Sequence, residues 1–361
     1  MKTLLRLLLK SQHQRNRSGP AQTEKGMTLV ELLVGAIMAF LIITPMLGFV
    51  VDMLNTDRRE QVKSNTEQDI QAAVDFIAQD LSQAIYIYDN NPATTSTATT
   101  TATGIPALLA GQFIPPADTT QTPILVFWKR RQIKNAVPVN ATLTPKPSNC
   151  NPAALPGTAG ECNDTYVLSL VAYYQLKDQQ NTWCQPSGGI CPTRIARYEI
   201  RDGVKNPSSS DPANPYYTVD PKEAAAPHEA FNKEFDISKP TEKVTLGTAK
   251  FINPEVLVNY IDHGTKPELT GNECRTALGN PTTQTGIKTS FISEDTLKVT
   301  DRKNNITSFY ACVDTERNVA RVTIRGNSLR RLQTDADYDA NKSAYFPTAT
   351  VQVQGLGGLG K

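Results

Sequence analysis

Residues 26–31, Gly-Met-Thr-Leu-Val-Glu, lead directly into an uncharged apolar run from Leu32 to Val51, and this stretch decides the fold. The run is 20 residues long. As an α-helix it would extend about 30 Å, which matches the hydrocarbon core of a bilayer. Glu31 lies at its entrance, where an unpaired carboxylate would cost on the order of 3 kcal/mol. The sequence therefore predicts a membrane-spanning helix whose single acid needs a partner.

The residues before this stretch are basic. Residues 1–26 carry six Lys or Arg against one Glu, so their net charge is +5 and residues 27–361 carry −3. A basic flank stays on the cytoplasmic side of a membrane under the positive-inside rule. We therefore expect a single-pass protein of the inner (cytoplasmic) membrane, with a cytoplasmic N-terminus and a periplasmic or extracellular C-terminal domain. The basic charge of the chain does not indicate a nucleic-acid partner.

The junction resembles the prepilin cleavage site of type IV pilins and type II secretion pseudopilins, in which a basic leader ends in Gly. The resemblance implies cleavage after Gly26, an N-methylated Met27 as the new N-terminus, and Glu31 as the fifth mature residue. It also implies an assembly role for Glu31, whose carboxylate would neutralise the buried N-terminal amine of a neighbouring subunit. The sequence departs from the family at Met27, where Phe is most common, and at Gly48, where Pro is frequent; here the nearest proline is Pro45. The alternative is an ordinary signal anchor with a misplaced acid.

Apolar residues continue beyond the run at the spacing of one helical face. They are Ile70, Val74, Ile77, Leu81, Ile85 and Tyr88. We therefore expect a leader over 1–26, a transmembrane and assembly helix over 27–53, and an amphipathic helix over 54–88. The stretch from Phe76 to Ala84 resembles the F-I-x-x-D-L-x-x-A helix of the larger minor pseudopilins, the J-type and PilW-like pilins; a generic amphipathic helix is the alternative.

The rest of the chain reads as a linker and a β-rich domain. Residues 89–122 are predicted to be a Thr/Ala-rich linker, and residues 123–361 an extracytoplasmic β-rich domain with a long excursion over 205–242. Strands are predicted at 123–128, 166–176, 194–201, 243–246, 256–261, 306–313, 318–325 and 348–354. The second and third of these form a hairpin similar to the central hairpin of J-type pseudopilins. The fold class is α+β and pilin-like: a long N-terminal helix packed on an antiparallel β-sheet domain with long disulfide-stapled loops.

Six cysteines all follow the apolar run: Cys150, Cys162, Cys184, Cys191, Cys274 and Cys312. An even number in an exported domain favours disulfides, and six cysteines allow 15 pairings. Proximity in sequence suggests that the first pairs with the second, the third with the fourth, and the fifth with the sixth. A zinc site is disfavoured, because the sequence has no C-x₂-C pair.

One acidic pattern suggests a metal. Asp335, Asp337, Asp339 and Asn341 occupy every second position, as in a calcium-binding loop. The pattern then fails at Ala340, where such a loop needs Gly, and at Phe346, where it needs a bidentate Glu. A solvated acidic turn is the alternative, and the sequence indicates no cofactor other than this candidate calcium ion.

The sequence carries no motif for catalysis or for binding a cofactor. It lacks the G-x-S-x-G, H-E-x-x-H and phosphate-loop patterns, and no pair of carboxylates stands out. His228 lies in a Pro-rich segment and His263 beside a glycine. We therefore predict a protein that is not an enzyme.

The resemblance implies a minor pseudopilin or minor pilin that is cut by a prepilin peptidase and assembled near the tip of a type IV pilus-like filament. Its partners would be other pilins or pseudopilins and an inner-membrane assembly platform. The Asn/Gln/Thr-rich C-terminal domain looks most like cyanobacterial pseudopilins of hormogonium polysaccharide secretion, and type II protein secretion and pilus priming are the competing systems. The alternatives from other classes are a membrane-anchored adhesin or glycan-binding protein, and an anchored hydrolase.

Overall fold

The computed structural model describes residues 26–91, 104–111, 113–139, 160–177, 182–206, 209–211, 215–217, 227–228, 231, 254–269, 271–280, 292–301, 303–334 and 336–356. The chain divides into two compact units, Met1–Arg58 and Arg59–Lys361. Helix α2 (Leu29–Ser82) contributes residues to both units. The described part of the second unit also contains three short helices, α3 (Ile105–Ala110), α4 (Glu273–Leu278) and α5 (Glu294–Leu297), and the 3₁₀ turns η1 (Leu329–Arg331) and η2 (Ala340–Tyr345).

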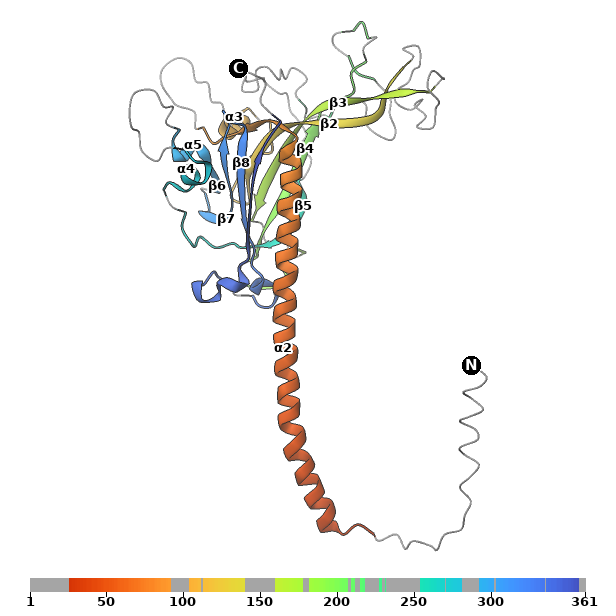
Figure 1. Ribbon diagram of the computed structural model, residues 1–361, viewed down its shortest axis with the longest axis vertical. Coiled ribbons are helices and arrows are strands. Elements are labelled where there is room, and N and C mark those ends of the chain that lie inside the picture. The colour runs from red at the N-terminus through yellow and green to blue at the C-terminus, as the bar shows by residue number, and fades with distance from the viewer. Residues whose placement is uncertain are drawn as a thin grey trace. The chain divides into compact units, whose positions relative to one another are not determined.

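Two antiparallel sheets form the framework of the second unit (Figure 1). The five-stranded sheet has the order β1-β2-β3-β4-β5, from β1 (Ala84–Tyr88), β2 (Gln121–Pro138), β3 (Cys162–Leu176), β4 (Thr193–Arg201) and β5 (Glu255–Ile261). The four-stranded sheet has the order β6-β7-β8-β9, from β6 (Lys298–Asp301), β7 (Ile306–Asp314), β8 (Val319–Arg325) and β9 (Thr348–Gln354). A long helix with antiparallel sheets and disulfides confirms the predicted α+β class.

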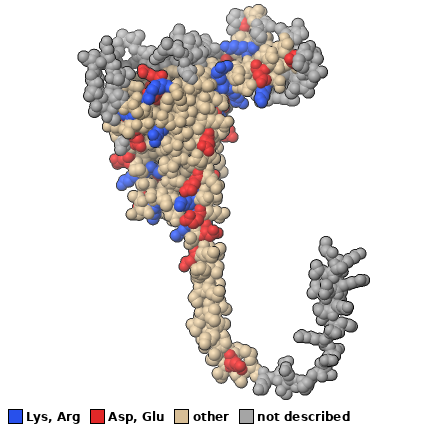
Figure 2. All heavy atoms as spheres, in the orientation of Figure 1, with Lys and Arg blue, Asp and Glu red and all other residues tan. Residues whose placement is uncertain are grey.

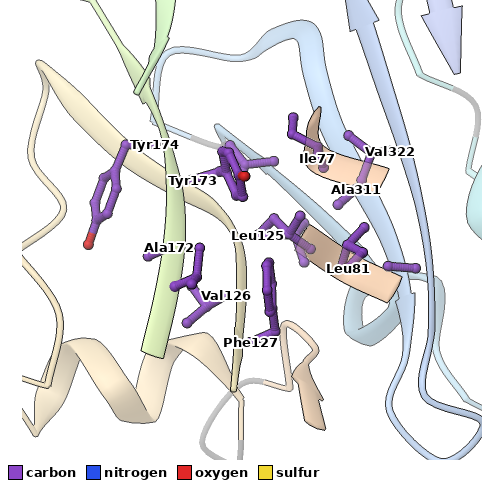
Figure 3. Packing of buried hydrophobic residues seen from close by; sticks show 14 of the residues in the cluster. Ile77, Leu81, Leu125, Val126, Phe127, Ala172, Tyr173, Tyr174, Ala311 and Val322 are labelled. Carbon is purple, nitrogen blue, oxygen red and sulfur yellow. The ribbon is translucent and has the colours of Figure 1, made fainter. Parts of the chain in front are cut away.

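The amphipathic part of α2 packs where the two sheets approach each other. Its buried face includes Ile77 and Leu81, both fully buried. Figure 3 shows these two side chains beside Leu125 of β2 on one side and Val322 of β8 on the other. One continuous core thus joins the helix to both sheets, and the helical spacing predicted this face.

The predicted amphipathic helix over 54–88 was too long. Helix α2 ends at Ser82, and the following Ala84-Ile-Tyr-Ile-Tyr segment forms β1 instead. This segment is rich in β-branched and aromatic residues, which favour strands when a neighbouring strand is present. Strand β1 pairs with β2 and buries Ile87, whereas the helical spacing had placed Ile85 in the core.

The predicted linker over 89–122 is also corrected in its described part. Residues 105–110 form α3, and Ile105 and Leu108 join the main core together with Phe113 and Ile114. The Thr/Ala tract at 93–103 lies outside the described residues, as do the predicted strand over 243–246 and most of the excursion over 205–242. The other predicted strands are present, and β1 and β6 were not predicted.

Two of the three predicted disulfides join the expected cysteines. Cys184 is bonded to Cys191 in the connection between β3 and β4, and Cys274 of α4 is bonded to Cys312 of β7. Cys162 is also disulfide-bonded, and Cys150, its predicted partner, lies outside the described residues.

A fully buried arginine holds the loop of the first disulfide. Arg330 donates from Nε to the carbonyl of Ile190, and from its two Nη atoms to the carbonyls of Pro186 and Gly188, each at 2.9 Å. Its Nη2 also lies 3.4 Å from the Sγ of Cys184. A planar guanidinium can satisfy several carbonyls at once, whereas an ammonium cannot reproduce this fork. Arg330 therefore fixes this loop to the turn after β8.

We expect Arg330→Lys to lower the free energy of unfolding by about 2–4 kcal/mol, because buried carbonyls lose their donors. Chemical denaturation of the full chain in detergent micelles measures this change, and limited proteolysis should show faster cleavage within residues 184–191. Arg59→Lys, at an exposed position on α2 in the same unit, is the matched control and should leave both measurements nearly unchanged. Equal effects of the two variants would contradict the role of Arg330.

Candidate functional site

The predicted processing residues lie directly before a capped helix. Gly26 and Met27 are exposed and non-helical, and α2 begins at Leu29. Thr28 caps the helix, because its Oγ1 accepts a hydrogen bond from the backbone N–H of Glu31 at 3.3 Å. Glu31 lies in the first turn and is exposed. The structure thus brings Gly26, Met27 and Glu31 together at one accessible helix start.

The first unit has an apolar surface without a cover among its described residues. Large apolar side chains between Met27 and Leu54 are between 48% and 82% exposed. Figure 2 shows this part of the helix as a surface nearly free of charged side chains. An apolar surface of this extent in water marks a site for lipid or protein. Within the described residues, α2 is the helix that is long and apolar enough to cross a membrane.

Small residues in this segment have no role within the described chain. A Cβ added at Gly35 or Gly48 would meet no atom within 4 Å. A glycine inside a helix destabilises it by about 1 kcal/mol relative to alanine. Since neither glycine makes room for another described part of the chain, no packing contact offsets this cost. Gly35 and Ala39 lie one turn apart, a spacing that lets a second helix approach closely. Pro45, the proline nearest to Gly48, lies inside the continuous helix.

In the second unit, Asp80 of α2 binds the five-stranded sheet through a buried ionic network. Its Oδ1 accepts from Lys129 Nζ of β2 at 2.7 Å, and its Oδ2 accepts from Arg197 Nε of β4 at 2.8 Å. The hydroxyl of Tyr173 of β3 donates to the same Oδ2 at 2.7 Å. Glu199 of β4 completes the network, with its Oε2 2.6 Å from Arg197 Nη2. Three neighbouring strands thus hold one helix carboxylate.

The pKa values of the two carboxyls follow from this arrangement. Burial raises the pKa of Asp80, but the hydrogen bonds and charges of Arg197 and Lys129 outweigh it, so the pKa lies below the ordinary value. Burial likewise raises the pKa of Glu199, and the charges of Arg197 and Lys129 bring it below the ordinary value. Both groups therefore stay ionised in the folded protein at neutral pH.

Because both folded-state pKa values lie below the unfolded values of about 4, the network stabilises the fold above that range. Its contribution is lost as the pH falls through the folded-state values. We expect Asp80→Asn to cost about 3–5 kcal/mol at pH 7, since Lys129 and Arg197 lose a buried partner. Denaturation at a series of pH values should also show that the unfolding free energy of Asp80→Asn falls less steeply below pH about 4 than that of the wild-type chain.

Asp75→Asn is the matched control for this prediction, because Asp75 lies on the exposed face of the same helix. Its unfolding free energy should stay within about 0.5 kcal/mol of the wild-type value. If Asp80→Asn behaved like Asp75→Asn, the network would not attach the helix.

The residues of the predicted calcium loop are not brought together as ligands in the described part of the chain. Asp337 Oδ1 lies 2.9 Å from His263 Nε2, and Asp339 Oδ1 accepts from the backbone N–H of Asn341 at 2.9 Å. Asp335 lies outside the described residues. Among the residues that are described, no group of three or more His, Cys, Asp or Glu side chains could hold a metal ion. Calcium binding stays a prediction.

One surface hollow of about 290 Å³ lies between α4 and the strands β7 and β8. A hydrolase would require converging polar groups there. The hollow contains one carboxylate, Glu273, and its Oε1 already accepts from the Tyr310 hydroxyl at 2.8 Å. Its described lining therefore offers no pair of carboxylates for glycoside hydrolysis.

The sequence did not identify the sheet partners of Asp80. Lys129 follows the apolar run of β2 and is buried, and Arg197 and Glu199 alternate with apolar residues along β4. Alternation of this kind indicates two faces, and it gave no means to decide which face would be covered by the helix.

No family model, curated protein or solved structure matches the chain. The structure itself shows a long N-terminal apolar helix, antiparallel sheets and disulfides. This combination is compatible with a pilin-like fold.

Proposed function

We propose that the chain is a minor pilin or pseudopilin, cut after Gly26 by a prepilin peptidase and assembled near the tip of a type IV pilus-like filament. The observation that carries the proposal is the start of α2. There, an accessible glycine precedes a Thr-capped helix in which one acid, Glu31, lies directly before the exposed apolar run. A peptidase can reach this junction, and the new amine would lie one helical turn from the acid.

The exposed apolar segment supports assembly in two stages. In the membrane, lipid would cover the large side chains from Met27 to Leu54. In a filament, the same segments of neighbouring subunits would cover one another, and Glu31 would pair with a neighbour's N-terminal amine. Gly35 and Gly48 would permit the close approach of these helices. This role would explain why glycine, which destabilises a helix, occurs at these two positions.

The proposed filament would serve secretion or pilus priming. The Asn/Gln/Thr-rich character of the C-terminal domain favours polysaccharide secretion of the cyanobacterial hormogonium type, and type II protein secretion and pilus priming are the competing systems. A membrane-anchored adhesin or glycan-binding protein is the alternative function, and it would require no cleavage at Gly26.

Processing is tested by mass spectrometry of the N-terminus from cells with and without the prepilin peptidase. We expect a peptide that begins at methylated Met27 and depends on the peptidase. Gly26→Leu should abolish it, whereas Gly48→Leu, at another exposed glycine of the same unit, should leave it unchanged. An intact leader in both strains would refute the pilin proposal and leave an anchored binding protein as the better account.

Assembly is tested separately with Glu31→Gln, which keeps the shape of the side chain and removes its charge. We expect normal cleavage but at least a tenfold loss from the sheared filament fraction, because a buried amine would lose its partner. Asp52→Asn, at the other end of the apolar run, is the matched control and should assemble normally. Normal assembly of Glu31→Gln would show that this acid has no pairing role.

A further inference from the structure

Strand β9 forms one edge of the four-stranded sheet, and its pairing with β8 has no irregularity from Thr348 to Gln354. The same register continues past both ends of the strand. Gly326 N donates to Pro347 O, and Gly355 N donates to Asn318 O, each at 2.9 Å. In an antiparallel pair, successive residues alternately face the partner strand and face away from it. The odd-numbered residues of β9 therefore bond to β8.

The backbone N–H and C=O groups of the even-numbered residues consequently point away from β8. These residues are Thr348, Thr350, Gln352 and Gln354, and all four are exposed. Within the described part of the chain, no backbone hydrogen bond involves them on that side. A row of unpaired backbone groups at regular spacing is a template for another strand.

Parts of two other sheet edges, those at β1 and β5, are covered by the chain itself. The carbonyls of Ala84 and Ile87 in β1 accept from the side chains of Asn318 and Thr315. At the end of β5, the carbonyl of Tyr260 accepts from Asn327 N, and Ile261 forms a β-bridge with Gly326.

The edge at β6 is short and interrupted. Strand β6 has only four residues, begins with Lys298, and shifts register before Asp301. Short length, charge and irregularity are the devices that prevent edge pairing. Strand β9 has none of them, since its sequence Thr-Ala-Thr-Val-Gln-Val-Gln contains no charge and no proline.

The side chains on the two faces of β9 indicate which residue types would suit a partner strand. Ala349, Val351 and Val353 are partly buried against the main core. Thr and Gln side chains alternate with them on the exposed face. An added strand would place its own alternate residues beside these two rows. The matching sequence is uncharged, with small or β-branched apolar residues alternating with Thr, Ser, Asn or Gln.

We propose that the open edge of β9 accepts a strand from a different polypeptide, namely a neighbouring subunit that shares the filament. The inference deepens the proposed function and rests on it for the identity of the neighbour. A second copy of this chain is a poorer occupant. Within the second unit, Ile70 of α2 lies against Gly326 after the end of β8, and Ala84 just after the helix accepts a hydrogen bond from Asn318 before the start of β8. This part of α2 therefore runs along the sheet, and antiparallel pairing of two β9 edges would point the two copies of it in opposite directions. Two chains inserted in one membrane from the same side do not fit that arrangement.

The first test measures residue-resolved hydrogen exchange of the full chain in detergent micelles. We expect the amides of residues 349, 351 and 353 to exchange at least tenfold more slowly than those of residues 350, 352 and 354, because only the first set bonds to β8. Slow exchange of both sets in the isolated chain would show that the chain covers its own edge, and it would overturn the proposal.

The second test places a photo-reactive benzoylphenylalanine at Gln354 in the full chain in living cells. We expect an adduct with one other membrane-anchored polypeptide, mapped by mass spectrometry to an uncharged alternating segment. Gln352→Pro should reduce this adduct at least tenfold, because proline removes an outward N–H without disturbing the bonds to β8. Gln352→Lys should reduce it as well, and Asn163→Lys, at an exposed position of β3, should not.

Three results would refute strand addition at β9: no adduct, an adduct unaffected by Gln352→Pro, or an adduct with a second copy alone. Thermal unfolding of each variant checks that the sheet itself is intact. The mass of the N-terminal peptide, which reports whether the leader is cleaved, distinguishes failure of the pilin proposal from failure of the edge proposal. An intact leader together with a proline-sensitive adduct would refute the pilin assignment but retain the edge site, whereas a cleaved leader without an adduct would refute the edge site alone.

Discussion

The attachment of a long helix to a sheet by one buried carboxylate is the interaction on which the second unit depends. Asp80 accepts hydrogen bonds from Lys129, Arg197 and Tyr173, which come from three adjacent strands. Apolar packing of Ile77 and Leu81 is non-directional, so it would allow the helix to slide or rotate on the sheet. The ionic network has fixed geometry and therefore sets the position of the helix, at the cost of desolvating four charged groups.

The same helix shows how one element can meet two environments. From Leu32 to Val51 it has no charge and no polar face, which suits a surrounding of lipid or of other helices. After Arg59, Ile70, Val74, Ile77 and Leu81 form one apolar stripe that is buried, and the other positions are mostly polar, with Phe76 as an exposed exception. The change from uniform to striped hydrophobicity coincides with the boundary between the two units. It explains why the sequence predicted both halves.

Predictability from sequence differed between elements for physical reasons. Strand β9 was predicted with its observed bounds, because alternation and a following glycine define a half-buried strand. The segment from Ala84 to Tyr88 was assigned to the helix, because Ile85 and Tyr88 happen to continue its spacing and only pairing with β2 reveals the strand. The role of Arg330 depends on carbonyls about 140 residues away in sequence, and no local pattern reports such a contact. At the start of α2, the Thr28 cap and the exposure of Gly26 agree with the local motif, whereas cleavage and pairing involve other molecules.

The outer edge of β9 and the carboxylate of Glu31 are two features that the described part of the chain leaves without a partner. Asn318 and Thr315 close the edge of β1 with side-chain hydrogen bonds, and Asn327 closes the end of β5. Covering parts of these edges and interrupting the edge at β6 are devices that keep a sheet from pairing with another strand. An edge left straight and uncharged at β9 then needs a reason, as does an acid at the entrance of an apolar helix. Under the proposed function, partner subunits would supply one reason for both, because a subunit of a filament would gain stability from contacts that an isolated chain cannot make.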